Sequence, residues 1–310
     1  MRLINVKTYE IEEFFGSDIP NYVALSHTWL PQEEPSFQDW ANAYRSAKTC
    51  PDGIVAGMRV VMIDLNKILG YEKIHNFICE SQNLDGTYCW ADTVCIDKSS
   101  SAELSESINS MYKIYKNCER CLVYLQDIEV EVLLENDDFS LLVQSRWFAR
   151  GWTLQELIAP EHLVFYDREW TYIGSKERYK AYFQEATGIP SEVLLNANSW
   201  RAYSVAERMS WASKRTTTRE EDMAYCLLGI LDINMPLLYG EGEKAFQRLQ
   251  EEIIKKYDDD SIFAWSCPQS SRSTYRSILA RSPSEFANSK GISFFGSKNS
   301  EPYMMTNKGL

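Results

Sequence analysis

Short, almost fully apolar runs recur along the first half of the chain. Their β-branched and aromatic side chains favour strands, and the absence of an alternating polar face is typical of strands that are buried on both faces of a sheet. We expect four strands, at residues 22–27, 87–96, 121–125 and 163–166.

Apolar side chains at helical spacing separate these runs. Residues 64–83 and 103–117 each carry such a stripe, with Asp64 and a serine run at 99–101 as the expected N-caps. The alternation of strands and helices predicts an α/β fold in which helices cover both faces of a parallel sheet.

Two N-terminal stretches show neither pattern. Residues 1–20 are expected to be a short lead-in to the first strand. Residues 30–57 are rich in Pro, Ser, Gln and acidic side chains and are expected to form a long insertion with one amphipathic turn near residues 37–44.

The pattern changes to helices after residue 167. The expected helices are residues 175–187, 204–214, 218–231 and 242–257, and the expected short strands after them are residues 262–265, 292–295 and 303–305. We therefore divide the chain into an α/β domain at 1–172, a helical extension at 173–260 and a tail at 261–310, which we expect to continue in a longer parent protein.

Composition narrows the classes of partner. The chain has 310 residues, of which 45% are hydrophobic, and its net charge at pH 7 is -12. Because its Lys and Arg residues are scattered, nucleic acid and anionic membranes are not expected partners. Eight dispersed cysteines predict free thiols. With no apolar leader or spanning run, the expected location is the cytoplasm.

A short helix is expected at residues 153–158, beside a concentration of charged and aromatic side chains. Trp152 and Glu156 are four residues apart and share a helix face, and Arg146 and Arg150 lie just upstream. Such a set can hold a ring, a sugar and a phosphate. The alternative is that Trp152 anchors the core and Glu156 pairs with an arginine at the surface.

Polar residues also lie where the first two strands end. Ser26, His27 and Thr28 close the first strand, and Asp92 belongs to the second. Because ligands bind outside the carboxyl ends of parallel strands, we expect these residues and the helix at 153–158 to converge on one crevice. For His27, contact with a ligand and a purely structural role both stay open.

Other chemistries have less support in the sequence. It contains no G-x-G-x-x-G and no phosphate-binding P-loop motif. A hydrolase that uses Ser26 or Cys95 remains an alternative, but no G-x-S-x-G elbow is present, and the adjacent strand residues Ser26 and His27 point to opposite faces.

Three stretches together resemble the signature blocks of the fungal heterokaryon incompatibility (HET) domain. They read YVALSHTW, WADTVCID and RGWTLQELIAP, at residues 22–29, 90–97 and 150–160. Residues 217–222 and 235–242 are similar to the region that follows the domain in many members. The chain departs from the family at Leu30, where the first block usually has Gly.

The resemblance implies a fold and an activity. HET domains trigger programmed cell death between incompatible fungal strains and are thought to be distant relatives of TIR domains, which implies a TIR-like, flavodoxin-like parallel sheet with a mainly helical extension. In plant TIR domains a Trp-Cys-Leu-Asp-Glu-Leu helix carries the catalytic Glu of NAD cleavage. Residues 152–157 read WTLQEL and are similar to it, so Glu156 falls on the catalytic position.

The same resemblance implies a substrate site and partners. The expected substrate-contacting residues are Ser26, His27, Thr28, Trp29, Asp92, Arg146, Arg150 and Trp152. NAD is the expected substrate, with no metal or other cofactor, and activation is expected through self-association and an upstream sensor. The alternative function is a non-enzymatic signalling and assembly module.

Overall fold

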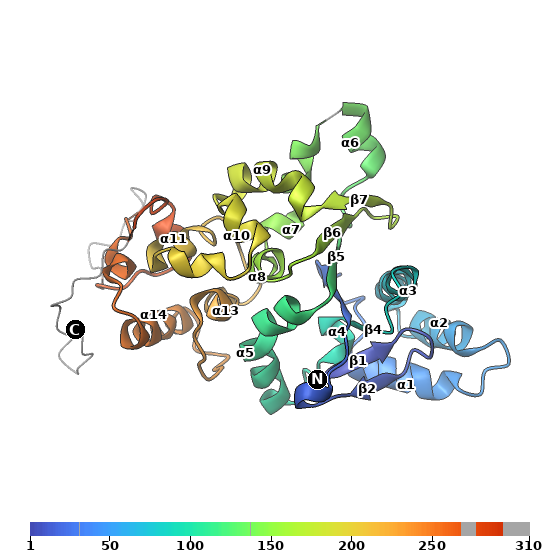
Figure 1. Ribbon diagram of the computed structural model, residues 1–310. Coiled ribbons are helices and arrows are strands. Elements are labelled where there is room, and N and C mark those ends of the chain that lie inside the picture. The colour runs from blue at the N-terminus through green and yellow to red at the C-terminus, as the bar shows by residue number, and fades with distance from the viewer. Residues whose placement is uncertain (31, 137, 268–276, 294–310) are drawn as a thin grey trace. The chain divides into compact units, whose positions relative to one another are not determined.

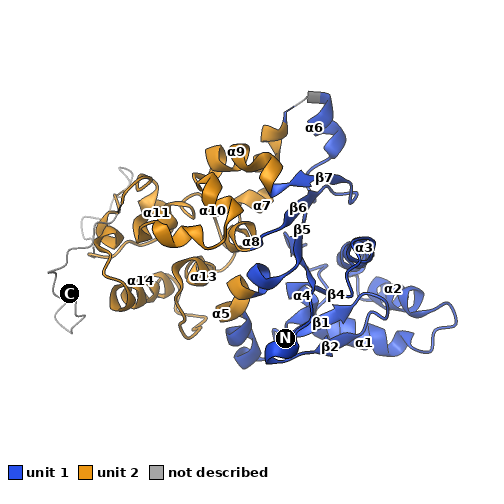
Figure 2. Ribbon diagram, viewed as in Figure 1, with its two compact units in different colours: residues 1–107, 114–138, 160–176 blue, residues 108–113, 139–159, 177–310 orange. Residues whose placement is uncertain are grey.

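The computed structural model describes residues 1–30, 32–136, 138–267 and 277–293 (Figure 1). Its packing divides the chain into two compact units that are interleaved along the sequence (Figure 2). Unit 1 comprises residues 1–107, 114–138 and 160–176, and unit 2 comprises residues 108–113, 139–159 and 177–310. The domain boundaries expected from the sequence stay a prediction.

Unit 1 is built on one seven-stranded sheet of order β2-β1-β4-β3-β5-β6-β7. Its strands are β1 (Arg2–Asn5), β2 (Ile11–Glu13), β3 (Val23–His27), β4 (Tyr88–Trp90), β5 (Arg120–Tyr124), β6 (Leu163–Tyr166) and β7 (Tyr172–Ser175). The strands β4, β3, β5 and β6 pair in parallel, whereas β1, β2 and β7 pair antiparallel. The α/β class is confirmed, but the sheet is mixed and not wholly parallel.

The parallel centre has a specific order. Numbered along the chain, its four strands are arranged 2-1-3-4, as are the first four strands of a flavodoxin-like sheet. In that arrangement ligands bind at the carboxyl end of the first strand, where the strand order reverses. Here the first strand is β3, which is buried along its whole length and ends at His27.

In the sequence, the helices of unit 1 connect its strands. They are α1 (Phe37–Ala47), α2 (Ile54–Asp64), α3 (Ile68–Asn83), α4 (Asp92–Cys95), α5 (Ser101–Asn117), which also contributes to unit 2, and α6 (Val130–Asn136), with a 3-10 turn at Gly16–Asp18. Ser100 caps α5 as expected from the serine run.

The insertion expected at residues 30–57 was a wrong prediction, because α1 and the start of α2 occupy it. The reason is a capping box. Ser36 Oγ accepts the Asp39 N–H at 3.2 Å, and Asp39 Oδ2 accepts the Ser36 N–H at 2.9 Å. With its first turn satisfied in this way, α1 buries Trp40 and Tyr44 despite its polar composition.

Other expected boundaries also shift. Asp64 ends α2 and does not cap α3, which begins at Ile68. The strand expected at 87–96 stops at Trp90, because residues 92–95 turn into α4. The lead-in at 1–20 holds the β1–β2 hairpin, which extends the sheet through the pairing of β1 with β4.

Unit 2 is helical in the part that the structure describes. Its elements are α7 (Arg146–Ala149), α8 (Thr153–Ile158), α9 (Lys176–Thr187), α10 (Ser191–Leu195), α11 (Val205–Ser210), α12 (Asp222–Tyr225), α13 (Leu228–Leu231) and α14 (Lys244–Lys256), with 3-10 turns at Phe139–Gln144, Ser199–Ala202, Asp260–Phe263 and Pro283–Phe286. None of the helices described in either unit is long and apolar enough to cross a membrane.

Two expectations for unit 2 are wrong. The helix expected at 218–231 is broken into α12 and α13. The side chain of Glu221, the residue before α12, accepts the N–H groups of Gly240 and Gly242 at 2.7 and 3.1 Å. The strand expected at 262–265 is also absent, because residues 262 and 263 end a 3-10 turn and residues 264 and 265 have no regular structure.

The remaining expected strands fall near the C-terminus. Residues 292 and 293 are not part of a strand, and residues 294, 295 and 303–305 lie outside the described part of the chain. All eight cysteines are free thiols, as expected.

The capping box of α1 yields a stability prediction. Replacing Ser36→Ala removes the acceptor for the Asp39 N–H and should lower the free energy of unfolding by about 1 kcal/mol. The measurement is urea denaturation followed by circular dichroism. Ser46→Ala is the matched control, because Ser46 is exposed in the same helix and Ala has the higher helix propensity. Equal loss in both variants would contradict the capping account.

Candidate functional sites

A partly buried polar cluster lies at the carboxyl end of β3 in unit 1. We call it the His27 cluster, and its members are His27, Trp29, Glu34, Lys73, Asp92 and Lys98. It contains three of the expected substrate-contacting residues. The other three members were not expected from the sequence.

Asp92 is the centre of the cluster. Its Oδ1 lies 3.1 Å from His27 Nε2, and its Oδ2 accepts the Trp29 Nε1–H at 3.1 Å and a longer contact of 3.4 Å from Lys98 Nζ. Burial raises the pKa of Asp92, but the charge of Lys98 and the His27 hydrogen bond outweigh it, so the pKa lies below its ordinary value. Asp92 is therefore an ionised carboxylate at neutral pH.

The protonation of His27 follows from this contact. An ionised carboxylate only accepts hydrogen bonds, so Nε2 carries the proton and Nδ1 bears a lone pair. Burial, together with the charge of Lys73, lowers the pKa of His27. The side chain is only 2% exposed, and Nδ1 has no hydrogen-bond partner among the described residues. An imidazole that a carboxylate orients and that keeps one free nitrogen can accept a proton or a ligand hydroxyl.

A second buried pair stands beside His27. Lys73 Nζ donates to Glu34 and, at 3.4 Å, to the Thr28 carbonyl. Glu34 Oε1 lies 3.9 Å from His27 Nδ1 and accepts the Leu30 N–H at 2.8 Å. This pair fixes the loop that follows β3. A lysine on the apolar stripe of α3 is the sequence signal that could have revealed it, since Lys73 is buried there.

The remaining candidates of unit 1 have other surroundings. Ser26 is fully buried within β3, and Thr28 contributes its carbonyl to Lys73. Burial raises the pKa of the Cys95 thiol to about 12, which argues against Cys95 as a nucleophile. Among the described residues, no group of three His, Cys, Asp or Glu side chains is arranged to hold a metal ion.

The segment around Glu156 lies in unit 2. The expected helix is present as α8, with the same first and last residues. All six of its residues are buried, and Glu156 is only 7% exposed. Trp152 is half-buried at the N-cap, Arg150 is half-buried, and Arg146 is exposed. The helix is therefore packed on every side.

Arg215 holds this segment and was not expected from the sequence. Its Nη1 donates to the Arg150 carbonyl at 2.8 Å and to Thr153 Oγ1 at 2.9 Å. Burial lowers the pKa of Arg215 to about 10. The negative charge of Glu156 opposes this effect and raises the pKa. The backbone at Gly151 passes so close to Thr217 that a Cβ on Gly151 would meet Thr217 Cγ2 at 2.5 Å.

The expected site residues thus form two groups. His27, Trp29 and Asp92 meet in unit 1, whereas Arg150, Trp152 and Glu156 belong to one segment of unit 2. Each group lies within a single unit. Their convergence on a single crevice stays a prediction.

The lowered pKa of His27 gives the protein a pH-dependent stability. Above pH 6.5 the imidazole is neutral in both states. As the pH falls through 6.5, His27 is protonated in the unfolded chain but stays neutral in the folded chain. The free energy of unfolding therefore drops by up to about 1.4 kcal/mol per pH unit. Urea denaturation at pH 7.5 and 5.5 should show this loss.

The variant His27→Gln should reduce that pH dependence. A part remains, because burial also lowers the pKa of His75. His162→Gln is the control, since His162 is exposed, and should keep the wild-type dependence. An unchanged slope in His27→Gln would show that His27 has the same pKa in the folded and unfolded states, contrary to this account.

Comparisons with known proteins agree with the sequence motifs. A family model described as heterokaryon incompatibility protein (HET) matches residues 22–140, and a model for a domain of unknown function (DUF8212) matches residues 244–275. Vegetative incompatibility protein HET-E-1 of Podospora anserina is 42% identical over 252 residues, which cover 79% of this chain and 17% of that protein. No solved structure matches. By its motifs and these matches, the chain belongs to the fungal HET-domain proteins.

Proposed function

We propose that this chain acts in fungal heterokaryon incompatibility as a cytoplasmic cell-death effector that cleaves NAD and releases nicotinamide. The similarity to a protein named vegetative incompatibility protein HET-E-1 supports the biological role. One observation carries the activity: the TIR-like sequence at 152–157 forms a helix with a buried carboxylate, Glu156.

A single carboxylate suffices for this reaction. The nicotinamide ring is cationic in NAD and leaves as a neutral pyridine, so no second carboxyl group needs to protonate it, unlike in ordinary glycoside hydrolysis. Glu156 would hold the ribose hydroxyls and stabilise the positive charge that develops on the sugar. In a site that excludes water, such preorganised stabilisation contributes about 3 kcal/mol.

The His27 cluster supports recognition of the rest of the substrate. Trp29 is 42% exposed and offers an aromatic face, and Asp92 is held ionised beside it. We propose that Trp29 or Trp152 stacks a ring and that Arg146 or Arg150 pairs with the pyrophosphate. NAD is then the only small-molecule requirement, without a metal or further cofactor.

Activation by self-association fits the burial of Glu156. A carboxylate that is 7% exposed has little surface for a substrate. We propose that assembly, triggered by an upstream sensor, uncovers it. Restricting activity to the assembled form would protect the cell from constant loss of NAD.

A second candidate function is a non-enzymatic assembly module. The observation that favours it is the same burial, together with the charge of Arg215 acting on Glu156. A carboxylate committed to a structural arginine would stabilise α8 instead of binding a sugar. In that case the chain would signal by homotypic contacts alone.

Replacing Glu156→Gln decides between these functions. Purified protein at increasing concentration should release nicotinamide from NAD, measured by chromatography, and Glu156→Gln should reduce the rate by about a hundredfold or more. The substitution is isosteric, so melting temperature and circular dichroism should show a retained fold.

The matched control is Glu177→Gln, because Glu177 is an exposed residue at the start of α9. It should release nicotinamide at the wild-type rate. Equal release by a folded Glu156→Gln variant would remove Glu156 from the mechanism. Cell killing without any loss of NAD would favour the assembly module.

A further inference from the structure

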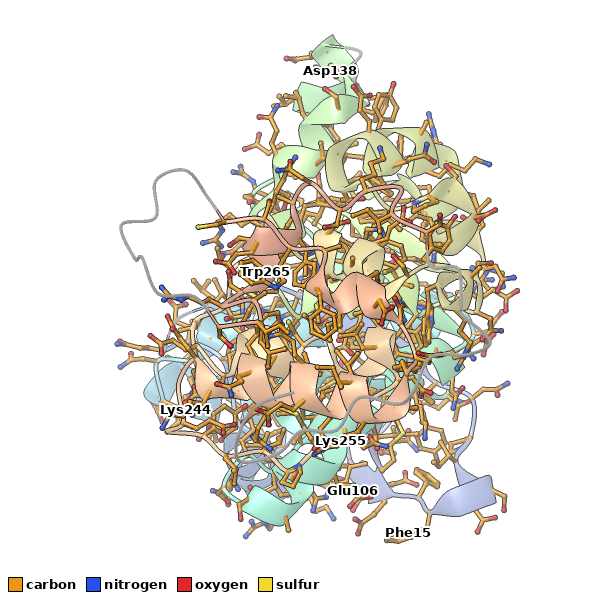
Figure 3. The ribbon with its side chains drawn as sticks, turned by 90° about the vertical axis from the view of Figure 1, so that its left-hand side faces the viewer. Phe15, Glu106, Asp138, Lys244, Lys255 and Trp265 are labelled. Carbon is orange, nitrogen blue, oxygen red and sulfur yellow. The ribbon has the colours of Figure 1, made fainter. Side chains whose placement is uncertain are left out.

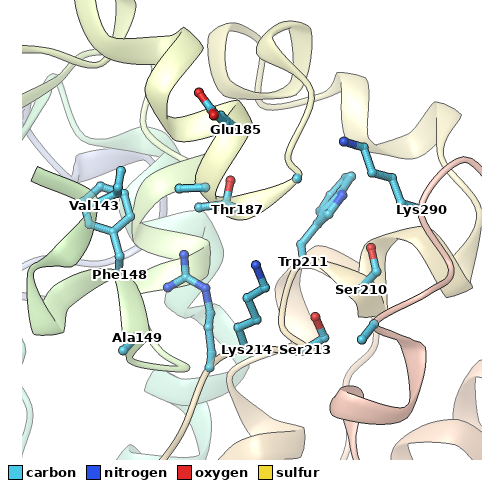
Figure 4. A pocket seen from close by; sticks show the side chains of 14 residues that line it. Val143, Phe148, Ala149, Glu185, Thr187, Ser210, Trp211, Ser213, Lys214 and Lys290 are labelled. Carbon is cyan, nitrogen blue, oxygen red and sulfur yellow. The ribbon is translucent and has the colours of Figure 1, made fainter. Parts of the chain in front are cut away.

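Unit 2 contains a cavity of about 380 Å³ whose lining does not include Glu156 (Figure 4). It is bounded by α7, by the end of α9 and by the turns after α11 and after residue 286. The lining residues are Val143, Phe148, Ala149, Glu185, Ala186, Thr187, Gly188, Ser210, Trp211, Ser213, Lys214, Arg215, Ala287 and Lys290. Neither the motifs nor the family matches assign a role to it.

The lining is positively charged. Lys214, Arg215 and Lys290 oppose a single carboxylate, Glu185, which leaves a net charge of +2 from three cations and one anion. In Figure 4 the two lysines approach the cavity from different elements. Neither lysine forms an ion pair with any residue that the structure describes. In a chain whose net charge is -12, this concentration of cations points to an anionic ligand.

Two buried hydrogen-bond donors at the cavity lack an acceptor. Trp211 Nε1 and Arg215 Nη2 have no partner among the described residues. The two side chains are 2% and 5% exposed. A buried donor without an acceptor is destabilising, and a guanidinium presents its donors in a fork that matches phosphate oxygens. Because both atoms are themselves enclosed, an anion in the cavity would act on the Arg215 guanidinium through its charge.

The size and the apolar wall indicate more than a small ion. A water molecule takes up roughly 30 Å³ in the liquid, so the cavity is far larger than an inorganic anion needs. Its volume falls within the range of small-molecule sites. Val143 and Phe148 supply apolar surface to the lining.

We propose that this cavity binds an organic phosphate monoester. The phosphate, which carries close to two negative charges at neutral pH, lies between the two lysines and within the field of the Arg215 guanidinium, and the organic part lies against Phe148. Because Arg215 Nη1 also holds the Arg150 carbonyl and Thr153, the ligand stabilises the segment that leads into α8.

Isothermal titration calorimetry on the purified chain tests the proposal with two chemically different monoesters. AMP and glucose 6-phosphate should bind, and both should bind at least about tenfold more tightly than adenosine and glucose, which lack the phosphate. Inorganic phosphate should bind more weakly than either monoester, because it leaves the apolar wall bare.

Variants at the rim locate the binding. Lys214→Gln and Lys290→Gln remove exposed charges and should keep the fold, and the double variant should weaken AMP binding by about tenfold or more. Lys244→Gln is the matched control. Lys244 is an exposed lysine at the first residue of α14 (Figure 3) that does not line the cavity, so its variant should bind AMP as the wild type does.

Three results would overturn the proposal. One is equal affinity for AMP and adenosine, which would mean that the phosphate is not recognised. Another is an equal loss of affinity in the double variant and in Lys244→Gln, which would indicate general charge attraction. The third is the absence of any heat of binding with millimolar AMP and glucose 6-phosphate.

Discussion

A charge that is buried needs partners, and this requirement shapes both units. In unit 1 the Asp92 carboxylate accepts from His27, Trp29 and Lys98, so its charge is compensated locally. In unit 2 the Arg215 guanidinium donates from Nη1 to two neutral oxygens and leaves Nη2 without an acceptor. Leaving a buried charged group incompletely paired is costly. The first arrangement is closed, and the second leaves part of the guanidinium without a hydrogen-bond partner among the described residues.

The closed arrangement limits what Trp29 can bind. Lys98 Nζ stands 3.7 Å from the centre of its ring and covers one face. The Nε1–H is committed to Asp92. A ligand ring could therefore stack only on the opposite face, in a fixed orientation relative to the carboxylate. A cation on the first face also makes the aromatic ring less attractive to a second positive group.

The sequence predicted the elements whose own residues determine them. The strand β6 and the helix α8 lie where expected, because each is a compact apolar or helix-forming run with clear ends. The strands β1 and β2 were missed, since four and three residues are too few to establish a period. Helix α1 was missed because its capping box outweighs a polar composition.

The candidate sites were only half predictable, for a related reason. His27, Asp92 and Glu156 stand out from motifs, whereas Lys73 and Arg215 do not. Lys73 pairs with Glu34 across 39 positions, and Arg215 contacts Arg150 across 65. For Lys73 the one local sign is its position on the apolar stripe of α3, and nothing near Arg215 in the chain indicates that its charge is buried. Only the folded backbone brings the partners together, so pattern reasoning cannot identify them.

The acidic character of the chain determines how an anion would reach unit 2. A net charge of -12 repels anions at long range. Near the cavity, the exposed Lys214 and Lys290 reverse the sign of the local field, but salt screens exposed charges strongly. Arg215 is shielded from salt by burial. The lysines should therefore govern how fast an anion is captured, and Arg215 how long it stays, since rim charges mainly affect association and buried pairs mainly affect dissociation.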